Sequence, residues 1–196
     1  GHDADLHCRF GSQCNHFGVA LDFARLAAPD PTKPLLFLDA SDNDMVVAEL
    51  SAVARAQNSV EGAGSPFPYL LVDPTSAGFG TLSLSTSSFS AIVIASDITC
   101  GGCDLNGFGG STPHSNAINA RTADIHSFFN AGGGLVYFSG ASNRAVYYSS
   151  VPVPAAAVAV SPPFTLTADG VAVGLLHPAD TNCCATHNSF SLPPAD

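Results

Sequence analysis

The sequence predicts a single α/β domain in which a mainly parallel sheet packs between two layers of helices, and two observations predict it. Short runs that are apolar at nearly every position recur along the chain, and each is too short for a helix. Stretches with apolar residues at helical spacing separate these runs. Strands of this composition are typical of parallel sheets that are buried on both faces. The predicted strands are Leu35–Leu38, Tyr69–Val72, Ala91–Ala95 and Leu135–Phe138.

Three helices are predicted from the periodicity and its end signals. The first covers His16–Ala28 and is ended by the prolines that follow it. The second begins at Asp42 or Asn43, either of which can cap it, and extends to Val53. The third covers Ile118–Phe129 and stops at a run of three glycines. Alternating strands and helices indicate βαβ units with right-handed crossovers, the arrangement of a flavodoxin-like three-layer sandwich.

The C-terminal quarter has a different composition and is predicted to be β and irregular. Val151–Val160 is rich in proline, alanine and valine, and Phe164–Thr167 alternates like an exposed or edge strand. Residues 192–196, which contain two prolines, are expected to begin a linker. A chain of 196 residues otherwise fits one domain with one core.

The composition narrows the function classes. The chain has 16 acidic and 6 basic residues, and Lys33 is its only lysine. An acidic chain with no basic stripe argues against nucleic-acid binding, although the acidic excess suits either solubility or cation binding. No apolar run approaches the roughly 18 residues that a membrane-spanning helix needs. Few charges and many Ser, Thr and Gly residues favour a secreted or cell-surface protein.

Six cysteines occur as three close pairs, which favours disulfide bonds over a metal site. The simplest pairing joins Cys8 to Cys14 and Cys100 to Cys103, but other connectivities stay open. Cys183 and Cys184 are adjacent, so each reaches a different partner or the two form a strained vicinal bridge. Cys100 and Cys103 also resemble a redox motif or half of a zinc site. A glycine-rich loop follows them rather than a helix, which favours a loop-closing disulfide.

The first candidate site lies where the strands end. Ligands of open α/β sheets bind beyond the carboxyl ends of the strands, and polar residues follow the predicted strands here. Asp3, Asp39, Asp97 and Ser139 are expected to converge on one crevice, where carboxylates hold a hard cation or act as general acid and base. The alternative is that these residues end strands and cap helices for local reasons.

Two further candidates contain histidine. His2, Asp3, Asp5 and His7 form a dense group that can ligate Zn²⁺ or Ca²⁺, unless an extended backbone points the two imidazoles apart or Gly1-His2 is not native. His187 follows the last cysteines, and a loop held by disulfides presents it as a base or ligand, although a structural histidine fits equally. No nucleophile elbow, phosphate loop or dinucleotide motif follows a strand, which argues against standard hydrolases and nucleotide-binding proteins.

The segment Phe128–Ala141, with its helix, glycine turn and strand, resembles the corresponding segment of ThuA-like proteins, which belong to the class-I glutamine amidotransferase-like superfamily. Ser96 and Asp97 stand where that superfamily builds its pocket. The resemblance covers Phe89–Ala141 and implies the fold more than the function. At the turn after the last strand, amidotransferases carry a nucleophilic cysteine; this chain has Ser139-Gly140, so glutamine hydrolysis is not expected.

Three functions are consistent with these observations. The first is a non-catalytic extracellular module, such as a surface-layer, adhesin or filament subunit, that associates with itself, with other extracellular proteins or with glycans. The second is a ThuA-like hydrolase or carbohydrate-active domain that uses Asp39, Asp97, Ser139 and His187. The third is a binding domain stabilised by calcium. The segments Gly1–Asp5 and Ala185–Phe190 are similar to segments of large secreted bacterial proteins of unassigned function, which favours a bacterial extracellular module.

Overall fold

The structure is a computed structural model of the whole chain. It describes residues 14–39, 68–95, 97, 105–106, 111–138, 144–159, 165–175 and 188–190. Of residues 14–17, 157–159 and 188–190 it describes the backbone alone.

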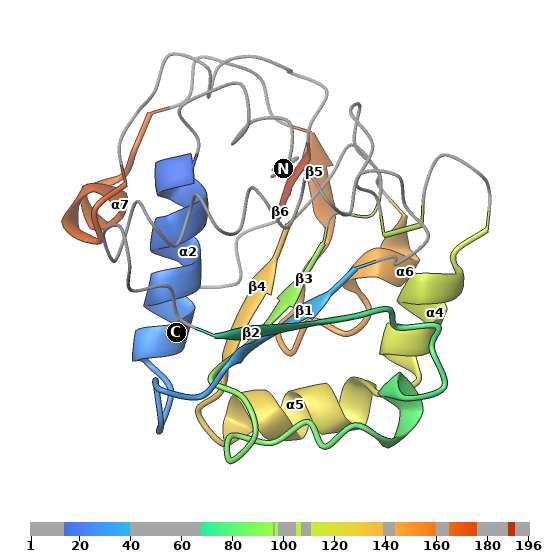
Figure 1. Cartoon of the computed structure of the whole chain (residues 1–196). Helices are drawn as coiled ribbons and strands as arrows, with labels where there is room; N and C mark the ends of the chain where they lie inside the picture. Colours follow the sequence, from blue (N-terminus) through green and yellow to red (C-terminus); the bar gives the residue numbers. More distant parts are fainter. Residues whose placement is uncertain are drawn as a thin grey trace.

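Four parallel strands form the central sheet, as predicted (Figure 1). They are β1 (Leu35–Leu38), β2 (Tyr69–Val72), β3 (Ala91–Ile94) and β4 (Gly134–Tyr137). Their order in the sheet is β2-β1-β3-β4, so the chain moves outward from β1 in one direction and then returns to continue in the other. The carboxyl ends of β1 and β3 therefore flank a topological switch point, where open α/β sheets bind their ligands.

Helices cover both faces of the sheet and complete a three-layer α/β sandwich (Figure 1). One core cluster contains Leu35 and Phe37 of β1 together with Leu21 of α2 (Cys14–Leu26). The other contains Leu36 and Leu38, with side chains from the two helices before β4. Alternate residues of one strand enter different clusters because successive side chains of a strand point to opposite faces. The predicted fold class is confirmed.

β2 differs from the strands beside it. β1 and β3 are fully buried, whereas every residue of β2 is partly or largely exposed, and Leu70 is 42% exposed. The prediction that this apolar run is buried on both faces is therefore wrong. The reason is its position: among the described strands β2 pairs with β1 alone and forms an edge of the sheet.

The predicted helix Ile118–Phe129 is two helices, α4 (Pro113–Asn119) and α5 (Thr122–Asn130). The break lies at Arg121, whose φ of −113° and ψ of 19° are not helical. The Thr122 hydroxyl donates to the Asn119 carbonyl at 2.8 Å. The Arg121 guanidinium donates to the Phe79 carbonyl at 2.5 Å and lies over the Phe79 ring. The Thr122 contact satisfies a carbonyl at the end of α4, and the Arg121 contacts tie the break to Phe79.

The glycine run before β4 meets two steric demands. Gly132 has a φ of 89°, a conformation that residues with a Cβ rarely adopt. Gly134 lies against the backbone of Ala24, so a Cβ at this position would overlap the Ala24 carbonyl oxygen and lie 2.9 Å from its Cβ. The small residue lets α2 pack directly on the start of β4.

The C-terminal quarter combines short elements: α6 (Ala145–Tyr148), β5 (Ala157–Ala159), α7 (Ala168–Ala172) and β6 (Asn188–Phe190). β5 and β6 pair antiparallel as a separate two-stranded sheet.

The predicted strand Phe164–Thr167 is wrong for its described part, because residues 165–167 are not extended in a sheet. The Thr167 hydroxyl instead accepts a hydrogen bond from the Gly170 N–H and caps α7. Within the described ranges, no helix has the length and apolar character needed to cross a membrane.

Candidate functional site

Two buried carboxylates stand at the carboxyl edge of the sheet, on the neighbouring strands that flank the switch point. Leu38 and Ile94 are register partners at the ends of β1 and β3. Asp39 follows Leu38 directly, and Asp97 lies three residues beyond Ile94. Their exposed fractions are 1% and 0%. The Asp39 N–H donates to the Val72 carbonyl of β2 at 3.2 Å, which extends the ladder and holds this residue at the sheet edge.

Asp97 is held by a cation and an amide. The Asn106 side-chain nitrogen donates to Asp97 Oδ1 at 2.6 Å. The Arg144 guanidinium lies 3.6 Å from the same oxygen and forms an ion pair with it. Asp97 Oδ2 is buried and has no hydrogen-bond partner among the described residues. The ion pair offsets part of the cost of burying the carboxylate, which would be large for an isolated charge.

Asn106 connects Asp97 to the start of α4. Its side-chain nitrogen also donates to the Ser115 hydroxyl at 2.6 Å. Its side-chain oxygen accepts the backbone N–H groups of His114 and Ser115 at 3.1 and 3.2 Å. Thr112, the residue in the N-cap position, makes no capping bond through its side chain. Asn106 therefore caps α4 from a position seven residues before the first residue of the helix, and it uses both donors and both acceptors of its amide.

His114, in the first turn of α4, links this helix to the turn after β2. Its Nε2 lies 3.4 Å from Asp73 Oδ1, and both side chains are largely buried. Asp73 Oδ1 also accepts the Thr75 N–H and hydroxyl, both at 2.7 Å, which shapes the turn. We use the name Asp97 network for the connected polar side chains of Asp73, Asp97, Asn106, His114, Ser115 and Arg144.

Three tyrosines brace α6 against the same edge of the sheet. The Tyr147 hydroxyl is buried within hydrogen-bonding distance of the Ala95 carbonyl, at 3.0 Å, and of the Phe138 carbonyl, at 2.5 Å. Its ring packs edge-on against Tyr137 and Tyr148. Burial, with smaller contributions from the other tyrosines and Asp97, raises the pKa of Tyr147 well above its ordinary value. The phenol therefore stays protonated and joins the ends of β3 and β4.

The pKa values of Tyr137 and Tyr148 are also raised. Burial raises the pKa of Tyr137 to about 12, although the Ser150 hydroxyl at 3.0 Å partly opposes this effect. Burial, followed by the charge of Asp97, raises the pKa of Tyr148 to about 12. At neutral pH these hydroxyls act as hydrogen-bond donors and not as bases.

Many of the predicted site residues lie outside the described residues, and their roles stay predictions. Of the proposed catalytic set, the structure describes Asp39 and Asp97 at one sheet edge, whereas Ser139 and His187 lie outside. The proposed metal group also lies outside, and among the described residues no three His, Cys, Asp or Glu side chains come together as a metal site. Of the cysteines, only the backbone of Cys14, in α2, is described. The other residues outside are His2, Asp3, Asp5, His7, Cys8, Cys100, Cys103, Cys183 and Cys184.

Sequence reasoning missed the residues that surround Asp97. Asn106 stands in a glycine-rich stretch of sequence with no periodicity, and Arg144 precedes a helix of only four residues. Pro113 at the first position of α4 was an available signal for a helix start. It does not reveal that the capping group comes from Asn106. Tyr147 carries no local signal for its contact with two strand ends.

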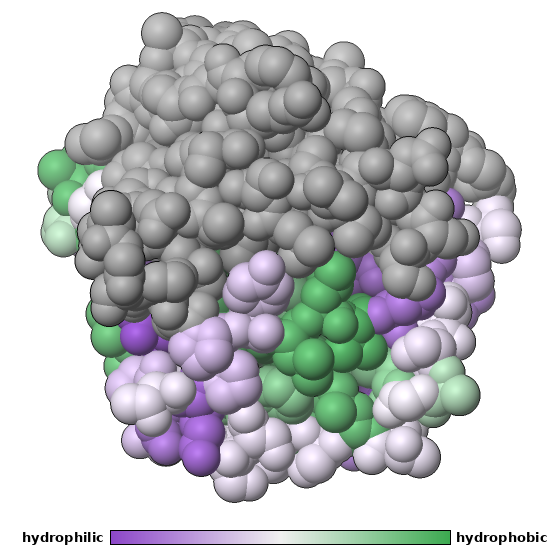
Figure 2. Space-filling view, viewed as in Figure 1, coloured by the Kyte–Doolittle hydropathy of each residue, from purple (hydrophilic) through white to green (hydrophobic). Residues whose placement is uncertain are grey.

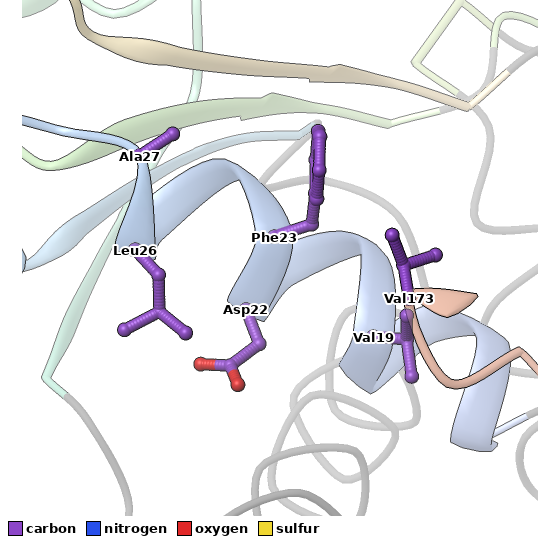
Figure 3. A pocket seen from close by; sticks show the side chains of 6 residues that line it. All are labelled: Val19, Asp22, Phe23, Leu26, Ala27 and Val173. Atoms are coloured by element: carbon purple, nitrogen blue, oxygen red, sulfur yellow. The ribbon is translucent and has the colours of Figure 1, made fainter. Parts of the chain in front are cut away.

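A second feature is a shallow apolar groove along α2, completed by Val173 at the end of α7 (Figure 3). It has a volume of about 420 Å³. Phe23 and Leu26 are 65% and 59% exposed there, and Asp22 is ion-paired with Arg25. The lining residues are Val19, Asp22, Phe23, Leu26, Ala27 and Val173.

Comparison of the chain with protein-family models, with curated proteins and with solved structures gave no match.

Proposed function

We propose that this chain is a non-catalytic binding or structural module of an extracellular protein. One observation carries the proposal: the carboxylate that stands where a catalytic acid or base would be expected holds the fold together. Asp97 is buried, paired with Arg144 and bound to Asn106, and Asn106 in turn caps α4. The side chains of Asp97, Asn106 and Arg144 thus have structural partners within the fold.

This arrangement is a poor starting point for general acid–base catalysis. A catalytic carboxylate must reach the proton that it transfers, directly or through one water. Asp97 is 0% exposed, and its Oδ1 already accepts from Asn106 at 2.6 Å. Proton transfer by Asp97 would disturb both the ion pair and the cap of α4. The same partners support a role in holding the loop, α4 and α6 on the sheet.

The sequence supports the extracellular part of the proposal. Six cysteines in three close pairs fit an oxidising compartment, and a surface covered by Ser, Thr and Gly fits a secreted module. The resemblance to ThuA-like proteins agrees with the fold but carries no activity to this chain, because folds host unrelated functions.

The test compares activity with stability in Asp97→Asn and its matched control Asp169→Asn, which changes an exposed carboxylate in the first turn of α7. We expect no turnover of ester, glycoside, amide or phosphate-ester substrates by the wild-type chain. We also expect Asp97→Asn to lower the free energy of unfolding by about 3 kcal/mol, the order expected when one partner of a buried ion pair is removed. Turnover that Asp97→Asn abolishes without changing the melting temperature would overturn the proposal.

A second candidate is a site for a cation or small polar ligand at the switch point. It is favoured by Asp97 Oδ2, which is buried without a hydrogen-bond partner among the described residues, because such groups are rare unless they have a role. Calcium stabilisation, or hydrolysis with Asp39, Ser139 and His187, belongs to this alternative. A melting temperature that falls in EDTA and recovers with Ca²⁺ would favour it over the structural module.

A further inference from the structure

The outer edge of β2 has an ordered set of backbone groups directed away from the sheet. The Leu35 N–H donates to the Pro68 carbonyl at 2.9 Å, and the Asp39 N–H donates to the Val72 carbonyl at 3.2 Å. The even-numbered residues of this strand therefore direct their backbone groups toward β1. In a strand, the intervening residues direct theirs to the opposite side. The N–H and carbonyl groups of Tyr69 and Leu71 thus point outward.

No described residue satisfies these outward groups. The described backbone hydrogen bonds include none from Tyr69 or Leu71 to a residue beyond the sheet edge, and β2 pairs with β1 alone among the described strands. The side chains nearby are apolar and partly exposed, with Leu70 at 42%. Figure 2 shows a hydrophobic patch at the place where Figure 1 has β2.

The edge also has few of the features that protect natural edge strands from pairing. Such strands usually carry lysine, an inward charge, a bulge or an internal proline. Tyr69–Val72 contains no lysine, no other charged residue and no proline, and its pairing with β1 runs without a bulge. Pro68 precedes the strand and contributes its carbonyl to β1, so it leaves the outer edge open. Among the described residues, the only protective feature of this edge is the length of β2, which has four residues and so offers few groups to a second strand.

We propose that two copies of this chain pair through their β2 edges, antiparallel, across a two-fold axis at Leu70. With this axis, Tyr69 of one copy faces Leu71 of the other, and the reverse pair forms at the same time. Each facing pair exchanges two hydrogen bonds, so the outward groups of both residues are satisfied. The two copies of Leu70 meet on the axis and remove apolar surface from water. The two sheets become one continuous sheet.

The register favours a second copy as the occupant, because the outward groups of Tyr69 and Leu71 lie symmetrically about Leu70 and match their own two-fold image. The charge distribution permits this contact. The chain has a formal net charge of −10, so two copies repel over most of their surfaces. Pro68–Val72 carries no charged side chain, so two copies can approach closely there without bringing like charges together. Asp73 lies three residues from the axis, so the Asp73 residues of the two copies stand about 20 Å apart at the rise of a strand. That distance exceeds the Debye length at physiological salt.

The dimer goes beyond the proposed function and does not depend on it, because β2 and the Asp97 network are separate parts of the fold. A catalytic or ligand-binding chain could dimerise in the same way. Equally, a monomeric chain could still be a structural module.

The experiment measures the oligomeric state of the full chain by sedimentation over a wide range of protein concentrations. Leu70→Lys places like charges on the axis, and we expect the dimer dissociation constant to rise by at least about tenfold. The matched control is Phe23→Lys, which adds the same charge at a more exposed apolar residue of α2. We expect this control to leave the dissociation constant unchanged.

Hydrogen exchange of the wild-type chain tests the geometry without depending on a variant that folds. The Tyr69 and Leu71 amides should become protected as protein concentration rises, whereas the Leu70 amide, directed toward β1, should change little. The inference is wrong if the chain stays monomeric, if both lysine variants weaken the dimer equally, or if open oligomers form instead. It is equally wrong if a dimer forms and the protection of Tyr69 and Leu71 does not depend on concentration.

Discussion

Asn106 and Asp97 join the start of a helix to the end of a strand through one hydrogen bond of 2.6 Å. The Asn106 amide that donates to this carboxylate also accepts the backbone N–H groups at the start of α4. A single side chain thus satisfies the helix terminus and a buried charge together. Because each contact fixes the position of the amide for the other, the two form a cooperative unit.

Asn106→Ala should destabilise the chain by about 2–4 kcal/mol. The substitution removes the cap of α4, worth on the order of 1 kcal/mol, and also leaves Asp97 without one of its donors. The measurement is the free energy of unfolding from urea titration. Asn116→Ala is the matched control, because Asn116 is an exposed residue of the same helix. The control should change stability by no more than about 0.7 kcal/mol, and alanine favours the helix.

Equal effects of the two asparagine variants would contradict the role of Asn106 as a cap. If Asn106→Ala still lowers the free energy of unfolding when Asp97 is also replaced by Asn, the remaining loss measures the contribution of the cap without the carboxylate contact. Full additivity of the two substitutions would show that the contacts do not depend on each other.

The sequence predicted the central sheet because its strands are short apolar runs with polar ends, which is a local property. The edge position of β2 could not be predicted in this way. Tyr69–Val72 is as apolar as Leu35–Leu38, and the difference between them depends on the order of strands in the sheet. The break between α4 and α5 is also non-local, because Arg121 is bound to Phe79, which begins a 3-10 helix (Phe79–Thr81) 42 residues earlier in the chain.

In the candidate site, too, local sequence patterns predicted some residues, and contacts between separate segments determined the others. Asp39 and Asp97 were predictable from their places after apolar runs, since parallel strands bring their carboxyl ends to one edge. Asn106, Arg144 and Tyr147 were not, because each lies in a segment with no strong local pattern and reaches the edge only when the chain is folded. A sequence reading finds residues by their position along one strand, and it misses partners that come from other segments.

Stability should fall as pH rises above about 10, because three tyrosines are buried as neutral phenols. The folded pKa of Tyr137 and Tyr148 is about 12, and the pKa of Tyr147 lies well above its ordinary value. The unfolded chain releases these protons near pH 10. The stabilisation is therefore complete below pH 10 and is lost progressively as pH rises through the folded pKa values.

Two measurements check this pH dependence. The urea midpoint should decrease between pH 9 and pH 11, and Tyr148→Phe should reduce the slope because it removes one titrating group. Ultraviolet titration of the folded chain should show that most of its four tyrosines ionise only above about pH 11. If all four ionise together near pH 10 while the chain stays folded, the tyrosines are not buried as described.

Gly134→Ala should destabilise the chain by at least about 2 kcal/mol, because the added Cβ would overlap the Ala24 carbonyl oxygen where α2 packs on β4. The Ala24 carbonyl is part of the backbone and cannot rotate away as a side chain can, so α2 would have to move away from β4. Gly78→Ala is the control, since a Cβ there meets nothing within 4 Å and the residue already has a φ of −69°. This control should be neutral or slightly stabilising, because alanine reduces the entropy of the unfolded chain. Thermal unfolding of the two variants gives the comparison, and a Gly134→Ala chain as stable as the wild type would mean that α2 does not pack this closely on the start of β4.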